Sequence, residues 1–266
     1  KIGRYLCRHR GNKIVEAIYG ELAAFLKDLD NSNWDMDKNG EKRVLRCLEI
    51  IDPKCVLDVG ANVGEWSTLV SHMYSTCEIH SFEIVPSTYE KLVNNTKFND
   101  LIITNNYGLS DATGNLVMNL SETDSTVATA CPIQGSQYHR DFYTAEIKCE
   151  VSTGSMYLNS SSISSIDFLK IDVEGMDFRV LKGFGDKLEV AKVIQFEYGI
   201  FNISSHDLLA DFFTLLEAKG FLVGKIYPCR VKFFEYHFEN EDFGGHNYLA
   251  VRKDQKNLIE VLSGLN

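Results

Sequence analysis

Carboxylates follow two apolar segments that we expect to form neighbouring strands of one sheet. Asp172 ends the segment Asp167–Asp172, and Glu174 comes two positions later. Glu197 lies near the end of the segment Val193–Tyr198. In an open α/β sheet, ligands bind outside the carboxyl ends of the parallel strands. Clustered carboxylates resist ionising together unless a cation or a donor lies among them. This edge therefore suits removal of a proton from a hydroxyl group, by a carboxylate or with a divalent cation held by Asp172 and Glu197.

A last strand, Asn247–Arg252, is expected to run antiparallel to the others, because the connection 228–245 before it contains no convincing helix. The strand would then begin at the same edge, where a histidine can accept a proton from a hydroxyl group. The predicted catalytic residues are Asp172, Glu197 and His246. The predicted contacts to the acceptor molecule are Glu174, Tyr198, Tyr227 and Asn247.

Structural alternatives stay open for three of these residues. Glu197 could pair with Lys170 instead of acting on a substrate. Glu174 could cap the helix that follows it, where a negative charge is favourable. His246 could be held by a loop carbonyl.

A glycine turn follows the predicted strand Cys55–Asp58. Gly60 and Gly64 lie in this turn, and a helix-like segment, Glu65–Ser75, follows at once. A strand, a glycine turn and a helix in this order typically present free backbone N–H groups to a nucleotide-like ligand. Glycine is suited to such a turn because a Cβ atom would block close approach or a positive φ.

The spacing of this turn argues against a dinucleotide. The pattern G-x-G-x-x-G, counted from Gly60, places Asn62 and Glu65 where the second and third glycines belong. A glutamate beside a pyrophosphate would bring like charges together at the helix N-terminus. The turn therefore favours a nucleoside ligand without a pyrophosphate, and S-adenosylmethionine is the obvious one.

Two further carboxylates are candidates for the nucleoside. Glu83 ends the predicted strand Glu78–Glu83, where a carboxylate can accept both ribose hydroxyls. Asp111, after the predicted strand Ile102–Tyr107, would lie at the next loop on the same edge and could reach an adenine. The alternatives are a solvated glutamate at a strand end and an aspartate that only forms a turn.

Strands that alternate with helices predict an α/β fold with a parallel sheet and right-handed crossovers. The seven predicted strands are Cys55–Asp58, Glu78–Glu83, Ile102–Tyr107, Asp167–Asp172, Val193–Tyr198, Phe221–Tyr227 and Asn247–Arg252. The predicted helices are Asn12–Leu29, Glu41–Ile51, Glu65–Ser75, Pro86 to about Asn99, Phe178–Lys182 and His206–Lys219. Alternation with period two over Gly114–Leu120 and Glu146–Val151 predicts an inserted hairpin, and the serine-rich stretch Asn159–Ser165 is interpreted as a loop.

Length and composition limit the possibilities. The 266 residues suffice for one large α/β domain with additions, which we divide into an N-terminal helical cap (1–52) and a main domain (53–266). The net charge of −10 argues against nucleic acid as the partner. No apolar run of about 18 residues predicts a membrane span. Seven scattered cysteines without a C-x-x-C pair are typical of buried thiols in a reducing compartment, so we expect a cytoplasmic protein. Because the chain begins with Lys1, we also expect fusion to other domains in a longer polypeptide.

Four ordered motifs resemble the FkbM family of S-adenosylmethionine-dependent methyltransferases. They are Val56–Gly64, Phe82-Glu83-x-x-Pro86, Gly108-Leu109-Ser110-Asp111-x-x-Gly114 and Leu169–Gly175. The segment Asn247–Val251 is also similar to the family's last strand. The chain departs from the family pattern at Ile84-Val85, which separate Glu83 from Pro86.

The resemblance implies the class I methyltransferase fold, a Rossmann-like, seven-stranded, mostly parallel sheet with an antiparallel last strand and helices on both faces. It implies S-adenosylmethionine as the cofactor. By position, Asp58, Gly60, Ala61, Asn62 and Gly64 would bind its methionine end. Glu83 would bind the ribose, and Ile84 would be a further cofactor contact. Ser110 and Asp111 would lie near the adenine, and Asp172, with Glu174 close by, would face donor and acceptor.

From the residues and the resemblance together, we expect an O-methyltransferase that acts on a hydroxyl of a sugar or glycan. A polyketide-type or other hydroxylated metabolite is the alternative acceptor, and a non-catalytic S-adenosylmethionine-binding module of a larger protein is the alternative function. Amino N-methylation is disfavoured, because Asp172-Val173-Glu174-Gly175 stands where such enzymes often carry Asp/Asn-Pro-Pro-Tyr. Acceptor choice is expected to lie in the cap, the 112–165 insertion and the 228–245 loop.

Overall fold

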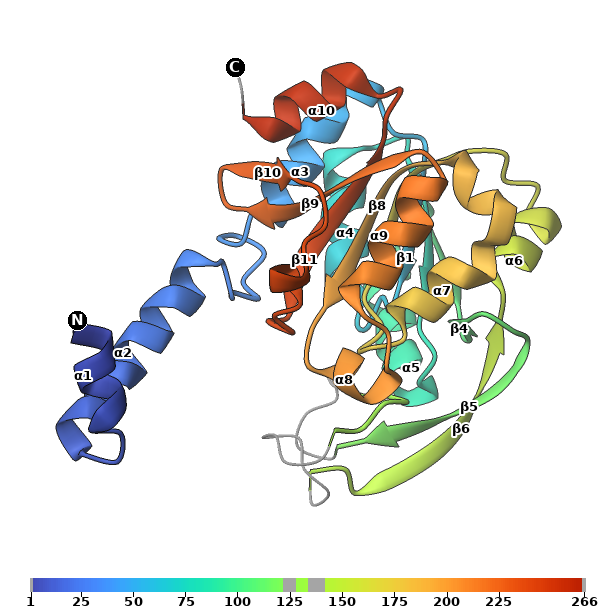
Figure 1. The fold of residues 1–266 in the computed structure, drawn as a ribbon. Coiled ribbons are helices and arrows are strands. Elements are labelled where there is room, and N and C mark those ends of the chain that lie inside the picture. Colours follow the sequence, from blue (N-terminus) through green and yellow to red (C-terminus); the bar gives the residue numbers. More distant parts are fainter. Residues whose placement is uncertain (1, 122–127, 134–141, 265–266) are drawn as a thin grey trace.

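The computed structural model describes residues 2–121, 128–133 and 142–264. Within this part of the chain, the main sheet consists of β1 (Cys55–Val59), β2 (Glu78–Phe82), β3 (Ile102–Asn105), β7 (Ile166–Ile171), β8 (Ala191–Tyr198), β9 (Phe221–Tyr227), β10 (Arg230–Phe233) and β11 (His246–Arg252). These eight strands lie in the order β10-β9-β11-β8-β7-β1-β2-β3 (Figure 1). The five strands β3, β2, β1, β7 and β8 pair in parallel, whereas β11 is antiparallel to both β8 and β9. The predicted α/β class, parallel sheet and antiparallel last strand are thus confirmed.

The eighth strand, β10, lies in the connection that we had interpreted as a loop. It forms a hairpin with β9 after Pro228 and Cys229. Val231 is buried and its neighbours Arg230 and Lys232 are exposed. Only four residues carry this alternation, which is why the period-two pattern was too short to predict a strand.

Helices cover both faces of the sheet (Figure 1). One core contains residues of α3 (Glu41–Cys47), α4 (Glu65–Met73) and α10 (Lys256–Ser263). The other core contains residues of α6 (Gly154–Ser160), α7 (Asp177–Phe184) and α9 (Leu209–Ala218). The helix α5 (Pro86–Thr96) begins with its proline in the first turn, as predicted.

Several helix boundaries differ from the prediction for local reasons. The helix predicted from His206 begins three residues later, as α9, and a separate helix, α8 (Phe201–Ser205), precedes it. His206 has a φ of 62° and ends α8. The stretch predicted as a loop, Asn159–Ser165, begins inside α6, whose start is capped by the Thr153 side chain. The helix α10 was not predicted, although Leu258, Ile259, Val261 and Leu262 follow helical spacing, and Leu258 and Leu262 are buried.

The predicted inserted hairpin is present. The strands β5 (Gly114–Leu120) and β6 (Ala145–Ser152) pair antiparallel over seven residue pairs. A two-residue strand, β4 (Gly108–Leu109), adds to β6 in parallel, so the insertion forms a separate three-stranded sheet.

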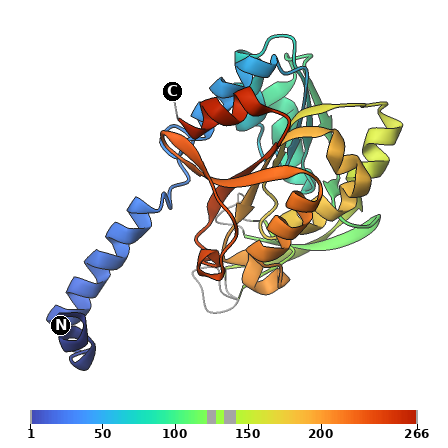
Figure 2. The ribbon, with the colours of Figure 1, turned by 45° about the horizontal axis from the view of Figure 1, so that its top comes forward.

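The two halves of the predicted N-terminal cap behave differently. Helices α1 (Ile2–Arg8) and α2 (Lys13–Leu29) project away from the rest of the chain in both views (Figures 1 and 2). Residues 30–41, which we call the strap, return to the main sheet, and α3 and the short helix η1 (Leu48–Ile51) pack into the core. The strap therefore brings residues from before the sheet to its carboxyl edge.

None of the helices in the described ranges combines the length and the apolar character that a membrane span requires. All seven cysteines are free. Cys77, Cys131 and Cys149 are buried as expected, whereas Cys7 and Cys229 are exposed.

Candidate active site

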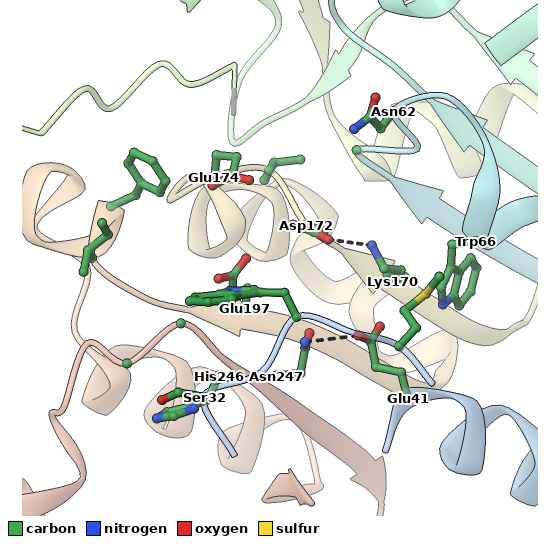
Figure 3. Close-up of a pocket in the computed structure, with 18 of the residues that line it drawn as sticks. Ser32, Glu41, Asn62, Trp66, Lys170, Asp172, Glu174, Glu197, His246 and Asn247 are labelled. Carbon is green, nitrogen blue, oxygen red and sulfur yellow. Dashed lines mark hydrogen bonds and ion pairs between the residues drawn. The ribbon is translucent and has the colours of Figure 1, made fainter. Parts of the chain in front are cut away.

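A cavity of about 1230 Å³ opens at the carboxyl ends of β1, β7 and β8 (Figure 3). The start of β11 and the strap also contribute to its lining. The structure brings most of the predicted site residues together here: Asp58, Gly60, Ala61, Asn62, Glu83, Ile84, Asp172, Glu174, Glu197, His246 and Asn247. Five other predicted residues, Gly64, Ser110, Asp111, Tyr198 and Tyr227, are not among the residues that line it.

The glycine turn uses its backbone donors internally. The N–H groups of Gly60 and Ala61 both donate to the carbonyl oxygen of Phe82, at 3.0 and 2.9 Å. The N–H of Asn62 donates to the Glu83 carboxylate at 3.0 Å. The N–H groups of these three residues are therefore not free, contrary to what was expected of the turn. Such a turn offers no row of donors to a phosphate, which agrees with the prediction of a ligand without a pyrophosphate.

Glycine is required at position 60 for two reasons. Gly60 has a φ of +88°, and a Cβ atom there would lie 1.9 Å from the carbonyl oxygen of Asp172. The turn after β1 thus packs directly against the end of β7. Gly64 has the same φ, and its missing Cβ makes room for Leu92 of α5, so this residue shapes the turn from behind.

Glu83 is buried at the end of β2 and is fixed by the backbone. Its Oε2 accepts the Asn62 N–H at 3.0 Å, and its Oε1 accepts the Val85 N–H at 2.8 Å. Burial raises the pKa of Glu83 to about 7, although these hydrogen bonds act in the opposite direction. Each carboxylate oxygen can accept a further hydrogen bond, so Glu83 can still bind two hydroxyl groups. The insertion Ile84-Val85 lets the carboxylate reach the N–H just before α5.

Asp58 is fully buried at the end of β1 and its carboxylate is only half satisfied. Its Oδ2 accepts the Ser67 hydroxyl at 2.6 Å, and Ser67 in turn lies 2.7 Å from the Ser81 hydroxyl. Its Oδ1 has no hydrogen-bond partner in the described part of the chain. Burial raises the pKa of this carboxyl group. A buried acceptor without a partner at the wall of a cavity is a place for a donor, preferably a cation.

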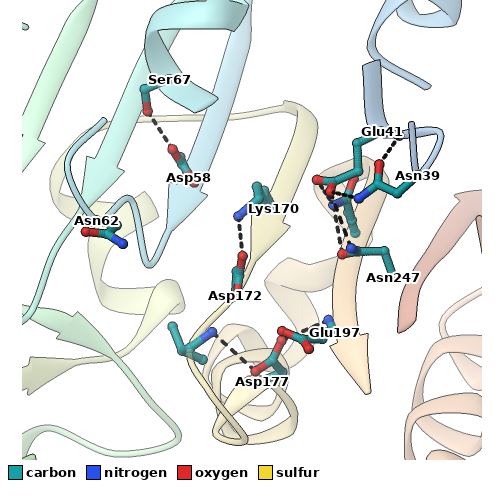
Figure 4. A network of polar contacts seen from close by, with 12 residues as sticks. Asn39, Glu41, Asp58, Asn62, Ser67, Lys170, Asp172, Asp177, Glu197 and Asn247 are labelled. Atoms are coloured by element: carbon teal, nitrogen blue, oxygen red, sulfur yellow. Dashed lines mark hydrogen bonds and ion pairs between the residues drawn. The ribbon is translucent and has the colours of Figure 1, made fainter. Parts of the chain in front are cut away.

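A buried lysine lies beside Asp58 and pairs with the predicted catalytic aspartate (Figure 4). Lys170 faces Asp58 across the β1–β7 register, and its Nζ donates to Asp172 Oδ2 at 2.8 Å. Burial by itself would lower the pKa of Lys170, but the carboxylates of Asp172, Asp58 and Glu41 outweigh it and raise the pKa. Lys170 therefore stays charged, and it pairs with Asp172 rather than with Glu197.

Three carboxyl groups converge between the ends of β7 and β8. One oxygen from each of Asp172, Glu174 and Glu197 lies within 4.8 Å of the other two. Burial, and then the neighbouring Glu174 and Asp172, raise the pKa of Glu197 well above its usual value. This group of three carboxyls, which we call the carboxyl cluster, takes up a proton, an organic cation or a metal ion more readily than an isolated carboxylate does.

Asp177, which the sequence analysis did not single out, orients the cluster from below (Figure 4). It is buried at the start of α7 and accepts the N–H of Glu197 at 3.1 Å and the N–H of Val173 at 3.4 Å. Burial, and then the charge of Asp172, raise the pKa of Asp177 to about 7. It thereby ties the loop after β7 to β8.

His246 lines the same cavity but faces a different pair of acids. Its Nε2 lies 3.4 Å from both Asp30 Oδ2 and Asp242 Oδ2. Lys225 lies between the same acids, 2.8 Å from Asp30 and 3.4 Å from Asp242. Burial by itself would raise the pKa of Asp242, but hydrogen bonds from His246 and the Gly244 N–H, together with Lys225, lower it to about 2. The Nδ1 atom of this buried histidine has no hydrogen-bond partner among the described residues.

The strap supplies a residue that sequence reasoning missed. Glu41 is buried in the cavity wall (Figures 3 and 4). Its carboxylate accepts hydrogen bonds from Asn39 at 2.6 Å, Gln195 at 2.8 Å and Asn247 at 3.4 Å. In the sequence, Asn39-Gly40-Glu41 is typical of an ordinary helix start, so no signal distinguished Glu41 from an exposed first-turn acid. Asn247, predicted as an acceptor contact, is thereby held to the strap.

The tyrosine Tyr198 is part of the core and does not reach the cavity. Its ring is fully buried, and its hydroxyl donates to Glu241. Glu241 also accepts the N–H groups of Leu209 and Ala210 at the start of α9. In this structure Tyr198 therefore holds the start of a helix.

The remaining predicted residues lie outside the lining of the cavity. The Tyr227 hydroxyl donates to Asp30 Oδ1 at 3.0 Å and so anchors the strap. Ser110 is buried after β4, and its N–H donates to the carbonyl of Ser152. Asp111 is exposed and lies 3.7 Å from Lys182.

Comparisons with known proteins show which family the chain resembles. The family model described as the methyltransferase FkbM domain matches residues 58–254. Hexuronic acid methyltransferase AglP of Haloferax volcanii is 25% identical over 180 residues, which cover 66% of this chain and 70% of AglP. Methyltransferase sdnD of Sordaria araneosa is 26% identical over 157 residues, which cover 50% of this chain and 61% of sdnD.

Among solved structures, the methyltransferase FkbM from Methylobacillus flagellatus KT superposes with a TM-score of 0.46 at 16% identity. The superposition covers 75% of this chain and 44% of that chain. This chain thus spans less than two thirds of the length of sdnD and less than half of the Methylobacillus protein.

Proposed function

Because this chain belongs to the FkbM family of methyltransferases, we propose that it transfers a methyl group from S-adenosylmethionine to a hydroxyl group of a sugar or glycan. The donor and the acceptor would meet in the cavity at the carboxyl edge of the sheet. The observation that carries the proposal is the pair of buried, incompletely bonded carboxylates, Asp58 and Glu83, beside a glycine turn whose N–H groups point inward.

These residues fit the chemistry of the proposed donor. S-adenosylmethionine supplies a methyl group on a sulfonium, and it carries an ammonium group and a ribose but no phosphate. The unpartnered Oδ1 of Asp58 suits the ammonium group, and the remaining lone pairs of Glu83 suit the ribose hydroxyls. Ala61, Asn62 and Ile84 line the space between them.

The carboxyl cluster would act on the acceptor. An acceptor hydroxyl must lose its proton as its oxygen bonds to the methyl carbon, and a carboxylate of the cluster can take that proton. Glu197 is the preferred base, because its raised pKa makes it a stronger proton acceptor than an ordinary glutamate once it is ionised. A positive charge placed beside the cluster lowers that pKa and favours the ionised state. Lys170 holds Asp172 in a fixed orientation next to it.

A divalent cation is the alternative partner of the cluster. Asp172, Glu174 and Glu197 offer three oxygen ligands, the type that Mg²⁺ and similar ions prefer. A cation there would acidify the acceptor hydroxyl directly. Assays with and without a chelator separate this route from proton transfer to a carboxylate alone.

The lining of the cavity favours a neutral acceptor. Its acidic residues are Asp28, Asp30, Glu41, Asp58, Glu65, Glu83, Asp172, Glu174, Glu197 and Asp242. Against these stand only Lys27, Lys170 and His246 in the described part of the lining. Trp34, which is 72% exposed at this cavity, offers a flat apolar surface of the kind on which a sugar ring can stack. AglP acts on a hexuronic acid by its name, but a uronate would meet an excess of negative charge here.

The test combines calorimetry with a product assay. S-adenosylmethionine should bind, and its labelled methyl group should appear on an acceptor from a panel of neutral glycans, with mass increases of one methyl group. Donor binding without turnover on any glycan or other hydroxylated acceptor would point to a non-catalytic binding module instead. No donor binding at all would contradict the proposal.

A further inference from the structure

The helices α1 and α2 form a hairpin, and the described part of the chain leaves most of its apolar side chains exposed. Both views show the hairpin standing away from the sheet and its covering helices (Figures 1 and 2). Along α2, the side chains of Ile14, Ile18, Leu22, Phe25 and Leu29 are between 41% and 72% exposed. A contiguous row of exposed apolar side chains on an otherwise folded protein marks an interaction surface.

The apolar positions of α2 follow the spacing of a paired helix. Val15, Ile18, Leu22, Phe25 and Leu29 are separated by alternating steps of three and four residues. This spacing places them on one stripe, the seam of a two-helix pair. Only Val15 is buried, because α1 packs over this end. The 17 residues of α2 make a helix about 25 Å long, enough for several layers of contacts.

A groove runs beside the seam, between α1 and α2. Its volume is about 320 Å³, and its lining is almost wholly apolar apart from Arg10. The residues that form it are Gly3, Leu6, Cys7, Arg10, Val15, Ile18, Tyr19 and Leu22. A third helix fits such a groove in the way that neighbouring helices pack in a bundle.

The charge of the hairpin is complementary to the rest of the chain. Residues 1–29 contain six lysines and arginines and three acidic residues, which gives them a net charge of +3. Because the whole chain has a net charge of −10, the remaining residues have a net charge of −13. The basic residues Arg4, Arg8, Arg10 and Lys13 gather at the free end of the hairpin. Asp28 and Asp30 lie at its other end and Glu21 lies in the middle of α2, whereas Glu16 lies near the basic end and pairs with Arg10 at 3.2 Å.

We propose that this hairpin pairs antiparallel with the hairpin of a second copy of the chain, so that the protein forms a two-fold dimer. An isologous contact needs a surface that matches itself, which a seam centred on Leu22 provides. An antiparallel arrangement brings the basic end of each hairpin to the acidic end of the other copy. A parallel arrangement would bring the two basic ends together, where they repel. Binding to an anionic membrane would bring the main domain, with its net charge of −13, close to a negatively charged surface. The dimer extends beyond the proposed methyl transfer and does not depend on it.

The pairing is tested on the full chain by sedimentation over a concentration series. The wild type should dimerise, and Leu22→Glu with Phe25→Glu should raise the dissociation constant at least tenfold. Ala17→Glu, at an exposed position of α2 outside the stripe, is the matched control and should leave the dissociation constant within about twofold. A wild type that stays monomeric at about 100 μM would overturn the proposal, as would a control that weakens the dimer equally.

Two further measurements guard against misfolded variants and other partners. Because the pair joins opposite charges, raising the salt from about 0.05 M to about 0.5 M should weaken the wild-type dimer. A dimer that strengthens under these conditions contradicts the antiparallel arrangement.

Flotation with vesicles of phosphatidylcholine and phosphatidylglycerol tests whether the hairpin binds a membrane instead. A monomer that floats with vesicles, and loses this on Leu22→Glu, would replace self-pairing with lipid binding.

Discussion

Lys170, near the end of β7, and Asp172, just after it, face the same cavity with Nζ and Oδ2 2.8 Å apart. Lys170 is buried, whereas the Asp172 side chain is 38% exposed. The lysine is thus the counter-ion of a buried group that also includes Asp58 and Glu41. Its single positive charge is what allows these carboxyls to lie so close together.

Replacing Lys170 with Met should destabilise the fold. The variant leaves Asp58 and Glu41 buried without a cation, so we expect the free energy of unfolding to fall by about 3 kcal/mol. Urea denaturation at neutral pH measures this. Lys182→Met is the control, because Lys182 lies 3.7 Å from Asp111 at the surface. That exposed pair should contribute less than about 1 kcal/mol, and equal losses in both variants would remove the special role of Lys170.

Glu83 should make donor affinity depend on pH. If Glu83 accepts the ribose hydroxyls as proposed, it does so best when ionised, and its pKa is raised to about 7 by burial. The affinity for S-adenosylmethionine should therefore rise by about tenfold between pH 6 and pH 8. Calorimetry at both values measures the change.

Glu83→Gln is the reference for this measurement, because the donor's own amino group also titrates near pH 8. The variant keeps the size of the side chain, but its amide NH₂ group then faces the backbone N–H of either Asn62 or Val85, so that two donors face each other. We expect affinity at least tenfold weaker, with the Glu83 step missing from the pH profile. A variant with the wild-type profile would show that Glu83 does not contact the donor.

Asp177 should make stability fall as pH rises toward neutrality. Its pKa is raised to about 7 in the folded protein, so between about pH 4 and pH 7 the folded state binds a proton that the unfolded state has lost. This contribution is fully present below pH 4 and is lost as pH rises through 7. In Asp177→Asn the unfolding free energy should change less over this range, although the amide satisfies only one of the two N–H groups. Urea titrations at several pH values decide the point, with the exposed Asp254→Asn as control.

The parts of the fold that depend on long patterns could be predicted from the sequence. Short apolar runs between helical patterns, such as Val56-Leu57 in β1 and Phe168-Leu169 in β7, indicated the parallel strands, and the glycine turn after β1 indicated the candidate edge. Four carboxylates at strand ends, Asp58, Glu83, Asp172 and Glu197, followed from the rule that parallel strands end at one edge. The free N–H groups expected in the turn did not follow, because a sequence does not tell which carbonyl lies opposite. In the structure the carbonyl of Phe82 lies opposite the turn, because β2 pairs in register with β1.

Contacts between distant segments were beyond the sequence. Glu41 reaches the cavity only because the strap returns across β9 and β11, where Asn31 donates to the carbonyl of Ile226 at 3.0 Å. Tyr198 was placed at the edge by its position in the strand, but alternate residues of a strand point to opposite faces, and its hydroxyl lies on the other side. Position along a strand therefore predicted the edge, and the side-chain direction had to come from the structure.

Glu197 and His246 should differ in their effect on turnover. If Glu197 takes the proton of the acceptor, Glu197→Gln should lower kcat by about 100-fold or more and leave donor affinity nearly unchanged. His246 is held at Nε2 by Asp30 and Asp242, so His246→Gln should cost less than about tenfold in kcat. Steady-state kinetics on any accepted glycan, with calorimetry for the donor, compares the two. A larger loss for His246→Gln would assign the base to the histidine, whose Nδ1 is unpartnered among the described residues.

The acidic lining predicts how the enzyme should choose between acceptors that differ only in charge. For a neutral methyl hexoside and the corresponding uronate, kcat/KM should favour the neutral sugar by at least tenfold, because the uronate carboxylate enters a cavity with an excess of carboxyl groups. Glu174→Gln removes one of these charges without changing the size of the side chain, so it should narrow the ratio. Tyr227→Phe, outside the lining, should leave the ratio unchanged.

Adding Mg²⁺ tests whether a cation can offset the negative charge of the cavity. If the ion raises activity on the uronate alone, it bridges the acceptor carboxylate to the carboxyl cluster. If the uronate is preferred without any metal, the cavity charge does not govern acceptor choice.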